Sequence, residues 1–181
     1  MACAAPDLPR RWAVAVVLWS VAGIASAAAG LPVRLEAPAE WIGHRLPVFS
    51  ARSLYGPNLR TSEYAGDVVL LAFWGSGCAR CAEPLAVVRA LHATYRDAGL
   101  VTLGVAIDDS AAEARAYAAA QRLDFPHMLD NTRSIARRFA LTELPTLMLV
   151  DRSGVVRQVY GRLDRKSRRV LVEDIRQLLD E

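Results

Sequence analysis

Two cysteines three residues apart, Cys78 and Cys81 in the stretch FWGSGCARCAEP, are the side chains of this sequence best suited to chemistry. Such a pair can supply half of a zinc site, form a structural disulfide or exchange electrons as a dithiol. Zinc would need two further ligands at matched spacing, and a disulfide over so short a loop removes little entropy from the unfolded chain. Redox exchange is therefore favoured over both alternatives. No second C-x-x-C pair exists, and the histidines are scattered: His44, His92 and His127.

The surroundings of the pair favour a reactive thiolate. The continuous apolar run Val68–Trp74 predicts a strand buried on both faces, and a helix is predicted directly after the cysteines. Free N–H groups and the helix dipole at such a helix start stabilise a thiolate. We expect Cys78 to be exposed, with a lowered pKa, and to attack; Cys81, one turn into the helix, should be buried and should resolve the mixed disulfide. Arg80 would further favour the thiolate, unless it is simply a solvated side chain.

The elements that must position this pair alternate between strands and helices. Helical spacing of apolar residues predicts a helix from about Leu85 up to Gly99, and a capping box at Ser110 starts another through residue 122. A third helix is expected from an Asp130 cap through Phe139, and a fourth from Asp164. Further strands are predicted at 100–107 and 125–129, and PTLMLVD and VVRQVYG read as a hairpin. The order predicts an α/β fold with a mixed central sheet flanked by helices.

The first thirty residues differ from the rest. Arg10 and Arg11 precede an apolar run that ends in small residues, the pattern of an export signal. We expect residues 1–29 to be a cleaved signal or an uncleaved anchor, because residues 12–30 are nearly long enough to span a bilayer. Residues 30–41 form a polar lead-in and residues 42–181 the folded domain. The net charge of +3 gives no indication of nucleic-acid binding. The periplasm is the predicted location.

Several motifs in order resemble the TlpA/ResA-type thiol–disulfide oxidoreductases of the thioredoxin-like superfamily. VVLLAFWGSGCARC resembles the family's active-site strand and motif, and IGHRLPVF resembles the start of its domain. GLVTLGVAIDD resembles its second strand, and LTELPTLMLVDRSGVV its proline loop and hairpin. The helix at 110–122 and the strand at 125–129 resemble the insertion that separates this branch from plain thioredoxin. The resemblance implies a thioredoxin-like fold for most of the chain after residue 41.

The resemblance also implies roles. Cys78 matches the nucleophile and Cys81 the resolving cysteine, as a Cys78–Cys81 redox-active disulfide. Pro145 matches the family's cis-proline, and the backbone of the preceding Leu144 would face a partner chain. Trp74 matches the aromatic residue at the strand end, although a purely core role fits it as well. No metal and no cofactor beyond the dithiol are expected.

The sequence departs from the family pattern around the pair. Gly77 replaces the usual tryptophan before the first cysteine, and Ala72 stands where thioredoxin has a buried acid. The branch places a glutamate three residues after the second cysteine, whereas Glu83 comes two after, and Pro84 lies three rather than five after it. One position turns a side chain by about 100° on a helix. Glu83 therefore either tunes the pair through a distorted first turn or is an ordinary acid at a helix start.

The predicted function is disulfide exchange with protein partners, most simply as a reductase recharged by a membrane electron donor. Reduction of cysteines for cytochrome c maturation is one job known in this branch. The alternatives are a peroxiredoxin-like peroxide reductase and a copper chaperone on a related fold. The first usually has a threonine before a lone cysteine, and the second needs cysteines four apart. The basic stretch Arg162–Arg169 is either a solvated face or a contact for an acidic partner or lipid headgroups.

Overall fold

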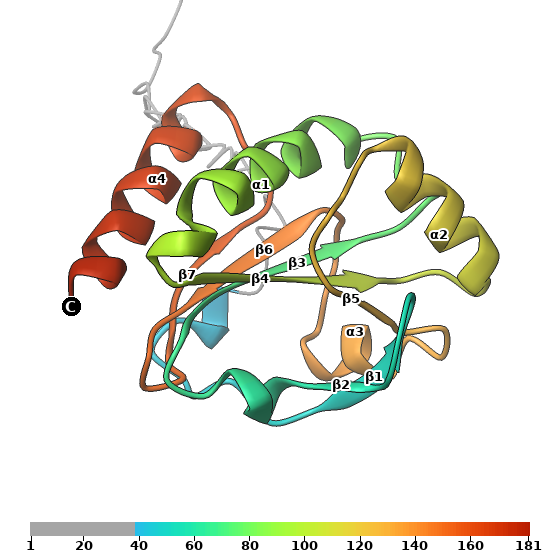
Figure 1. Cartoon of the computed structure of the whole chain (residues 1–181), viewed down its shortest axis with the longest axis horizontal. Coiled ribbons are helices and arrows are strands. Elements are labelled where there is room, and N and C mark those ends of the chain that lie inside the picture. Colours follow the sequence, from blue (N-terminus) through green and yellow to red (C-terminus); the bar gives the residue numbers. More distant parts are fainter. Residues whose placement is uncertain (1–38) are drawn as a thin grey trace, which may run out of the picture. The chain divides into compact units, whose positions relative to one another are not determined.

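A seven-stranded mixed sheet runs through the centre of the protein (Figure 1). The computed structural model describes residues 39–181. The order of strands across the sheet is β2-β1-β5-β4-β3-β6-β7. The elements are η1 (Ala39–Trp41), β1 (Ser50–Ser53), β2 (Leu59–Arg60), η2 (Thr61–Tyr64), β3 (Val68–Trp74), α1 (Ala82–Tyr95), η3 (Arg96–Ala98), β4 (Leu100–Ala106), α2 (Ala111–Ala120), β5 (His127–Leu129), α3 (Ser134–Arg138), β6 (Thr146–Val150), β7 (Val156–Tyr160) and α4 (Arg165–Asp180).

Strand β3 is the central strand that the apolar run predicted. All seven of its residues are buried. It pairs in parallel with β4 along its whole length and antiparallel with β6, so its backbone groups are satisfied on both edges. Strand β6 continues into β7 as an antiparallel hairpin. The predicted α/β fold with a mixed sheet is therefore confirmed.

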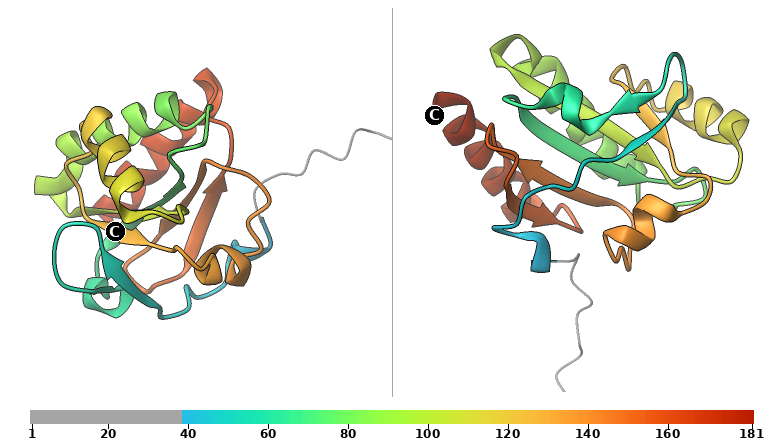
Figure 2. Two further views of the ribbon diagram at one scale, coloured as in Figure 1. Left: turned by 90° about the vertical axis from the view of Figure 1, so that its right-hand side faces the viewer. Right: turned by 90° about the horizontal axis from the view of Figure 1, so that it is seen from below.

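Helices cover both faces of the sheet. Because successive side chains of a strand point to opposite faces, β3 serves two cores. Leu70, Ala72 and Trp74 pack with α1, α2 and α4 on one face. Leu71 and Phe73 pack with α3 on the other. Figure 1 shows α1, α2 and α4 together above the sheet, and the view from below in Figure 2 brings α3 and η1 forward.

Helix boundaries follow the predicted caps with one exception. Ser110 accepts a hydrogen bond from Glu113 N, so the predicted cap at Ser110 is confirmed. The helix predicted to start near Asp164 begins at Arg165, and Asp164 caps it by accepting a hydrogen bond from Ser167 N. The helix predicted from Asp130 begins only at Ser134, and that prediction was wrong. Arg133 has a left-handed backbone, with φ at 56°, so residues 131–133 cannot form the first turn of a right-handed helix and α3 begins after them. The Asp130 carboxylate still accepts a hydrogen bond from Ala136 N, at 2.8 Å, from outside the helix.

The predicted export signal or anchor, residues 1–29, and residues 30–38 of the lead-in lie outside the described residues. The last three lead-in residues form η1 and belong to the folded domain. Trp41 packs its ring 4.9 Å from that of Phe139, and the following Gly43 N donates to Val156 O of β7. Within residues 39–181, no helix is both long enough and apolar enough to cross a membrane.

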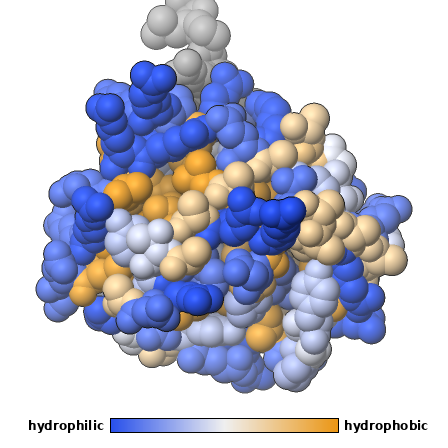
Figure 3. Space-filling view, turned by 45° about the horizontal axis from the view of Figure 1, so that its top comes forward, coloured by the Kyte–Doolittle hydropathy of each residue, from blue (hydrophilic) through white to orange (hydrophobic). Residues whose placement is uncertain are grey.

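A strip of hydrophobic surface lies between α1 and α4 (Figure 3). Val87, Ala90 and Leu91 of α1 line it opposite Val172 of α4. Hydrophilic residues surround the strip in this view. The two flanking helices are α1, which begins directly after Cys81, and α4, the last helix of the sequence.

His127, at the start of β5, is buried on the side of the sheet that α1, α2 and α4 cover. Its ring lies 5.4 Å from that of Trp74 and 4.6 Å from that of Phe125. The neighbouring strand has Gly104 here, because a Cβ at that position would lie 2.0 Å from the His127 ring. Neither ring nitrogen has a hydrogen-bond partner among the described residues. Burial therefore lowers the pKa of His127 from 6.5 to about 4.

The first prediction concerns stability at acid pH. Between pH 6.5 and about 4 the unfolded chain carries a proton on His127 that the folded protein does not. As the pH is lowered from 6.5 to about 4, the free energy of unfolding should therefore decrease, by about 3 kcal/mol in total. Below this window it should no longer change because of His127. Urea denaturation of wild type and His127→Leu at several pH values measures this, and the variant should lose this part of the slope.

The matched control is His44→Leu, because His44 is exposed. This control should keep the wild-type slope. A His127→Leu variant with an unchanged slope would contradict the account of His127.

Candidate active site

Cys78 and Cys81 are joined by a disulfide bond, with their Cα atoms 5.4 Å apart. The two sulfur-bearing residues differ in exposure. Cys81 is fully buried in the core beneath α1, whereas Cys78 is half-buried and packs against that core from outside. One sulfur is thus available to a partner and the other is enclosed, which is the asymmetry that the sequence predicted.

The loop from β3 to α1 holds the pair in two successive turns. Cys78 N donates to Gly75 O at 3.1 Å, and Cys81 N donates to Cys78 O at 3.1 Å. Helix α1 begins at Ala82, so Cys81 is the residue that caps it and does not lie one turn inside it as predicted. Pro84 occupies the first turn of α1, where its missing N–H would have had no partner in any case. The positive end of the helix therefore lies directly at the disulfide.

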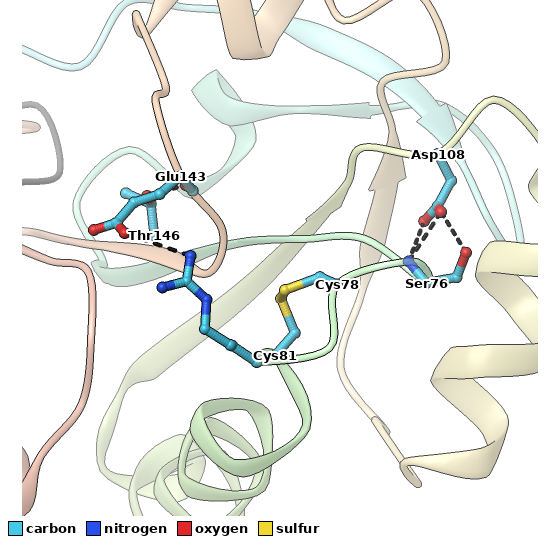
Figure 4. The surroundings of a disulfide bond; sticks show 7 residues. Ser76, Cys78, Cys81, Asp108, Glu143 and Thr146 are labelled. Atoms are coloured by element: carbon cyan, nitrogen blue, oxygen red, sulfur yellow. Dashed lines mark hydrogen bonds and ion pairs between the residues drawn. A yellow bond between two sulfur atoms is a disulfide. The ribbon is translucent and has the colours of Figure 1, made fainter. Parts of the chain in front are cut away.

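Asp108 anchors this loop from the end of β4. Its carboxylate accepts hydrogen bonds from Ser76 N at 2.9 and 3.1 Å and from Ser76 Oγ at 2.6 Å. Asp108 is only 7% exposed. Figure 4 shows this contact on one side of the disulfide. Asp108 was not identified from the sequence. The available signal was its place directly after a predicted buried strand that neighbours the strand leading to the cysteines.

The proline loop lies on the other side of the disulfide (Figure 4). The peptide bond between Leu144 and Pro145 is cis, as the family resemblance implied. Thr146 Oγ1 donates to Glu143 O at 2.8 Å, which fixes the turn around this bond. Leu144 lies next to the cysteine loop, since a Cβ on Gly75 would be 3.5 Å from its Cδ1 atom. Cys78 and Leu144 line one hollow of about 580 Å³.

Arg80 forms an ion pair across the site. Its Nη2 atom is 3.7 Å from Glu143 Oε2, so one of the two residues between the cysteines is linked to the proline loop. The Arg80 side chain is 59% exposed, and solvent screens much of its charge. Arg80 is thus neither an unpaired cation beside Cys78 nor a merely solvated side chain. Glu143 was not identified from the sequence, where nothing marks it.

Glu83 is paired with the start of α4. Its carboxylate accepts a hydrogen bond from Arg168 Nη2, while the Glu83 side chain remains 77% exposed. Of the two alternatives left by the sequence, this contact favours a surface acid that links α1 to α4. Arg168 belongs to the basic stretch Arg162–Arg169, so part of that stretch serves an internal contact.

The remaining departures from the family pattern leave the site open on one side. Gly77 is exposed, and a Cβ there would meet nothing within 4 Å, so no side chain covers the disulfide from that position. Ala72 is fully buried and offers no group that could hold a proton. Trp74 is also fully buried and stacks on Tyr117 at 5.4 Å, which fits its core role.

Burial of Tyr117 raises the pKa of its hydroxyl, and the negative charge of Asp108 raises it further.

Metal-ligating side chains do not cluster here. Among residues 39–181 there is no group of three or more His, Cys, Asp or Glu side chains that could hold a metal ion.

One known protein family matches the part of the chain that contains these features. Residues 42–159 match the AhpC/TSA family. The chain belongs to this family. The match covers both cysteines, the proline loop and most of the hairpin, so it includes every element that borders the disulfide.

Several relatives are named thiol-disulfide oxidoreductase ResA. The chain is 29% identical over 124 residues to the thiol-disulfide oxidoreductase ResA of Geobacillus kaustophilus, covering 68% of this chain and 71% of that protein. It is 28% identical over 145 residues to ResA of Geobacillus thermodenitrificans, covering 80% of each. The ResA-type resemblance, and the assignment to the thiol–disulfide oxidoreductases as an enzyme class, are therefore confirmed.

Solved structures agree on the fold. A candidate thiol:disulfide interchange protein DsbE from Chlorobium tepidum superposes with a TM-score of 0.72, at 24% identity, over 76% of this chain and 97% of that one. A thiol-disulfide oxidoreductase from Bacteroides fragilis gives a TM-score of 0.66 at 21% identity, over 72% and 98%. The predicted thioredoxin-like fold is confirmed, with α2 and β5 at the place of the expected insertion.

The second prediction concerns the Asp108 anchor. Asp108→Ala removes three hydrogen bonds to Ser76 and leaves the Ser76 N–H without its partner. The free energy of unfolding should fall by about 1–3 kcal/mol, measured by urea denaturation of the oxidised protein. Oxidation of added dithiothreitol should also slow, because the loop before Cys78 is no longer fixed.

Asp109→Ala is the control. Asp109 is the adjacent aspartate, but its side chain is 78% exposed and, within the part of the chain that the structure describes, it pairs only with Arg133, at 3.6 Å. This variant should resemble wild type in both measurements. Equal effects of the two substitutions would contradict the anchoring role of Asp108.

Proposed function

We propose that this protein exchanges disulfides with other proteins through Cys78 and Cys81, as a periplasmic reductase. The observation that carries the proposal is the unequal exposure of a bonded cysteine pair beside the proline loop. A half-buried sulfur can be reached by a partner, and an enclosed sulfur three residues on can release that partner. The family and the ResA relatives support the same chemistry.

The exchange proceeds in two substitutions at sulfur. In the reduced protein, the Cys78 thiolate attacks one sulfur of a partner disulfide, and the other partner sulfur leaves as a thiolate. Cys81 loses its proton and attacks Cys78 Sγ, so the Cys78–Cys81 bond forms and the second partner sulfur leaves. The partner gains two electrons and two protons, and the cysteine pair is oxidised. Each turnover therefore needs a dithiol donor, for which we propose a membrane electron donor.

Local structure aids the first substitution. The start of α1 lies at the disulfide, and its free N–H groups favour negative charge on sulfur. Leu144 lines the hollow beside Cys78, and together with Pro145 it lines a second hollow beside Ala79 and Arg80, so the extended chain of a partner can lie along the proline loop. No cofactor beyond the dithiol enters this scheme.

The two alternative functions have less support. A peroxiredoxin-like site would use a lone attacking cysteine with a threonine shortly before it, but Gly75, Ser76 and Gly77 precede Cys78, and Cys78 is bonded to Cys81. A copper chaperone would need cysteines four apart and a late histidine. The last histidine, His127, is fully buried on β5, before the proline loop.

The location and the partners belong to the same proposal. Arg10 and Arg11, followed by an apolar run, support export, with residues 12–30 as a membrane tether if the signal is retained. A disulfide-exchanging enzyme in the periplasm would act on protein thiols and disulfides. Reduction of cysteines for cytochrome c maturation is the specific task that we propose, on the strength of the ResA-type resemblance.

The third prediction tests the two cysteine roles. Cys78→Ser should abolish the reduction of insulin disulfides, because the attacking sulfur is lost. Cys81→Ser should also stop turnover, but by accumulating mixed disulfides with insulin that non-reducing electrophoresis detects. Ala79→Ser, in the same loop, should reduce insulin as wild type does.

Normal turnover by Cys81→Ser would contradict the resolving role. Equal trapping by both cysteine variants would contradict the division of labour between the two sulfurs.

A further inference from the structure

Arg137 lines the hollow beside Cys78 and has no ion-pair partner among the described residues. We propose that Arg137 makes the enzyme select partner proteins that have an aspartate or glutamate close to the reactive disulfide. This inference rests on the proposed function and adds the chemistry of the partner segment to it.

The hollow lies between the cysteine loop, α3 and the proline loop. Its volume is about 580 Å³. Cys78 and Arg137 both line it, so a partner segment that fills the hollow while it presents a disulfide to Cys78 also meets α3. The apolar part of the lining is formed by Ile107, Ala136, Leu141 and Leu144.

Three arginines border the hollow, and two of them are already paired. Arg80 lies 3.7 Å from Glu143, and Arg133 lies 3.6 Å from Asp109. Arg137 is exposed, and no ion pair or side-chain hydrogen bond is formed by it within residues 39–181. The charges of the first two arginines are balanced, so one positive charge remains on the α3 side of the hollow.

A partner segment complementary to this hollow has an apolar side chain over the lining and a carboxylate at the α3 rim. A guanidinium binds a carboxylate with two parallel hydrogen bonds, which the exposed end of Arg137 is free to form. An ion pair at such an exposed rim changes the rate of encounter and the choice of partner more than the total affinity. It also weakens as salt increases. A lysine in the same place on the partner would be repelled.

The test uses three peptides, each with one cysteine that is joined by a disulfide to a fluorescent thiol. The peptides differ at a single position, two residues from that cysteine, which is Glu, Gln or Lys. Reduced wild-type protein should react with the Glu peptide about 3–10-fold faster than with the Lys peptide, with the Gln peptide between them. Arg137→Glu should reverse this order, and Arg137→Gln should remove the preference. In 0.5 M NaCl the differences should shrink.

Arg169→Glu is the matched control, since Arg169 is an exposed arginine of α4 outside the hollow and the net charge changes equally. It should keep the wild-type order. Reduction of the small uncharged 2-hydroxyethyl disulfide should be the same in all four proteins.

The outcomes separate this inference from the proposed function. Equal rates on the three peptides, or the same reversal in Arg169→Glu, would overturn the selection by Arg137 even if the small disulfide is still reduced. Failure of wild type to reduce any of these disulfides would contradict the proposed function itself.

Discussion

Complete burial of β3 is the constraint on which the site depends. A seven-residue strand that is apolar on both faces can lie only at the centre of the sheet, between two hydrophobic layers. Its end at Trp74 therefore fixes where the chain leaves the core. After two turns the chain returns to the core at Cys81, which caps α1, while Cys78 between them stays half-buried at the edge of the core. The different exposure of the two sulfurs follows from this path.

Polar contacts then tie the cysteine loop and α1 to three other parts of the molecule. Asp108 at the end of β4 holds Ser76, and Glu143 of the proline loop pairs with Arg80. Glu83 joins the start of α1 to Arg168 of α4. The Asp108 contact is the most buried of the three, so we expect it to contribute most to stability. The Arg80–Glu143 pair is more exposed and links the cysteine loop to the proline loop.

Sequence reasoning reached the fold and the reactive pair because both depend on local, strong signals. Continuous apolar runs, the cap at Ser110 and the spacing of Cys78 and Cys81 each have one dominant physical interpretation. The start of α3 was missed because it depends on the left-handed backbone of Arg133, a residue type that gives no such signal. Glu143 and the partner of Glu83 could not be predicted, since each contact joins segments more than thirty residues apart. Asp108 had only its place after a buried strand as a signal, and its contact with Ser76 is also distant in the sequence. The signal or anchor, the partners and the location stay predictions.

Alkylation of the reduced protein tests the central claim, that one sulfur is open and activated while the other is enclosed. Limiting iodoacetamide is added over a range of pH, and peptide mapping by mass spectrometry reads the labelling rate of each cysteine. Cys78 should react at least about tenfold faster than Cys81, with a midpoint below the free-thiol pKa of about 8.5. Equal labelling of the two cysteines, or faster labelling of Cys81, would contradict the account.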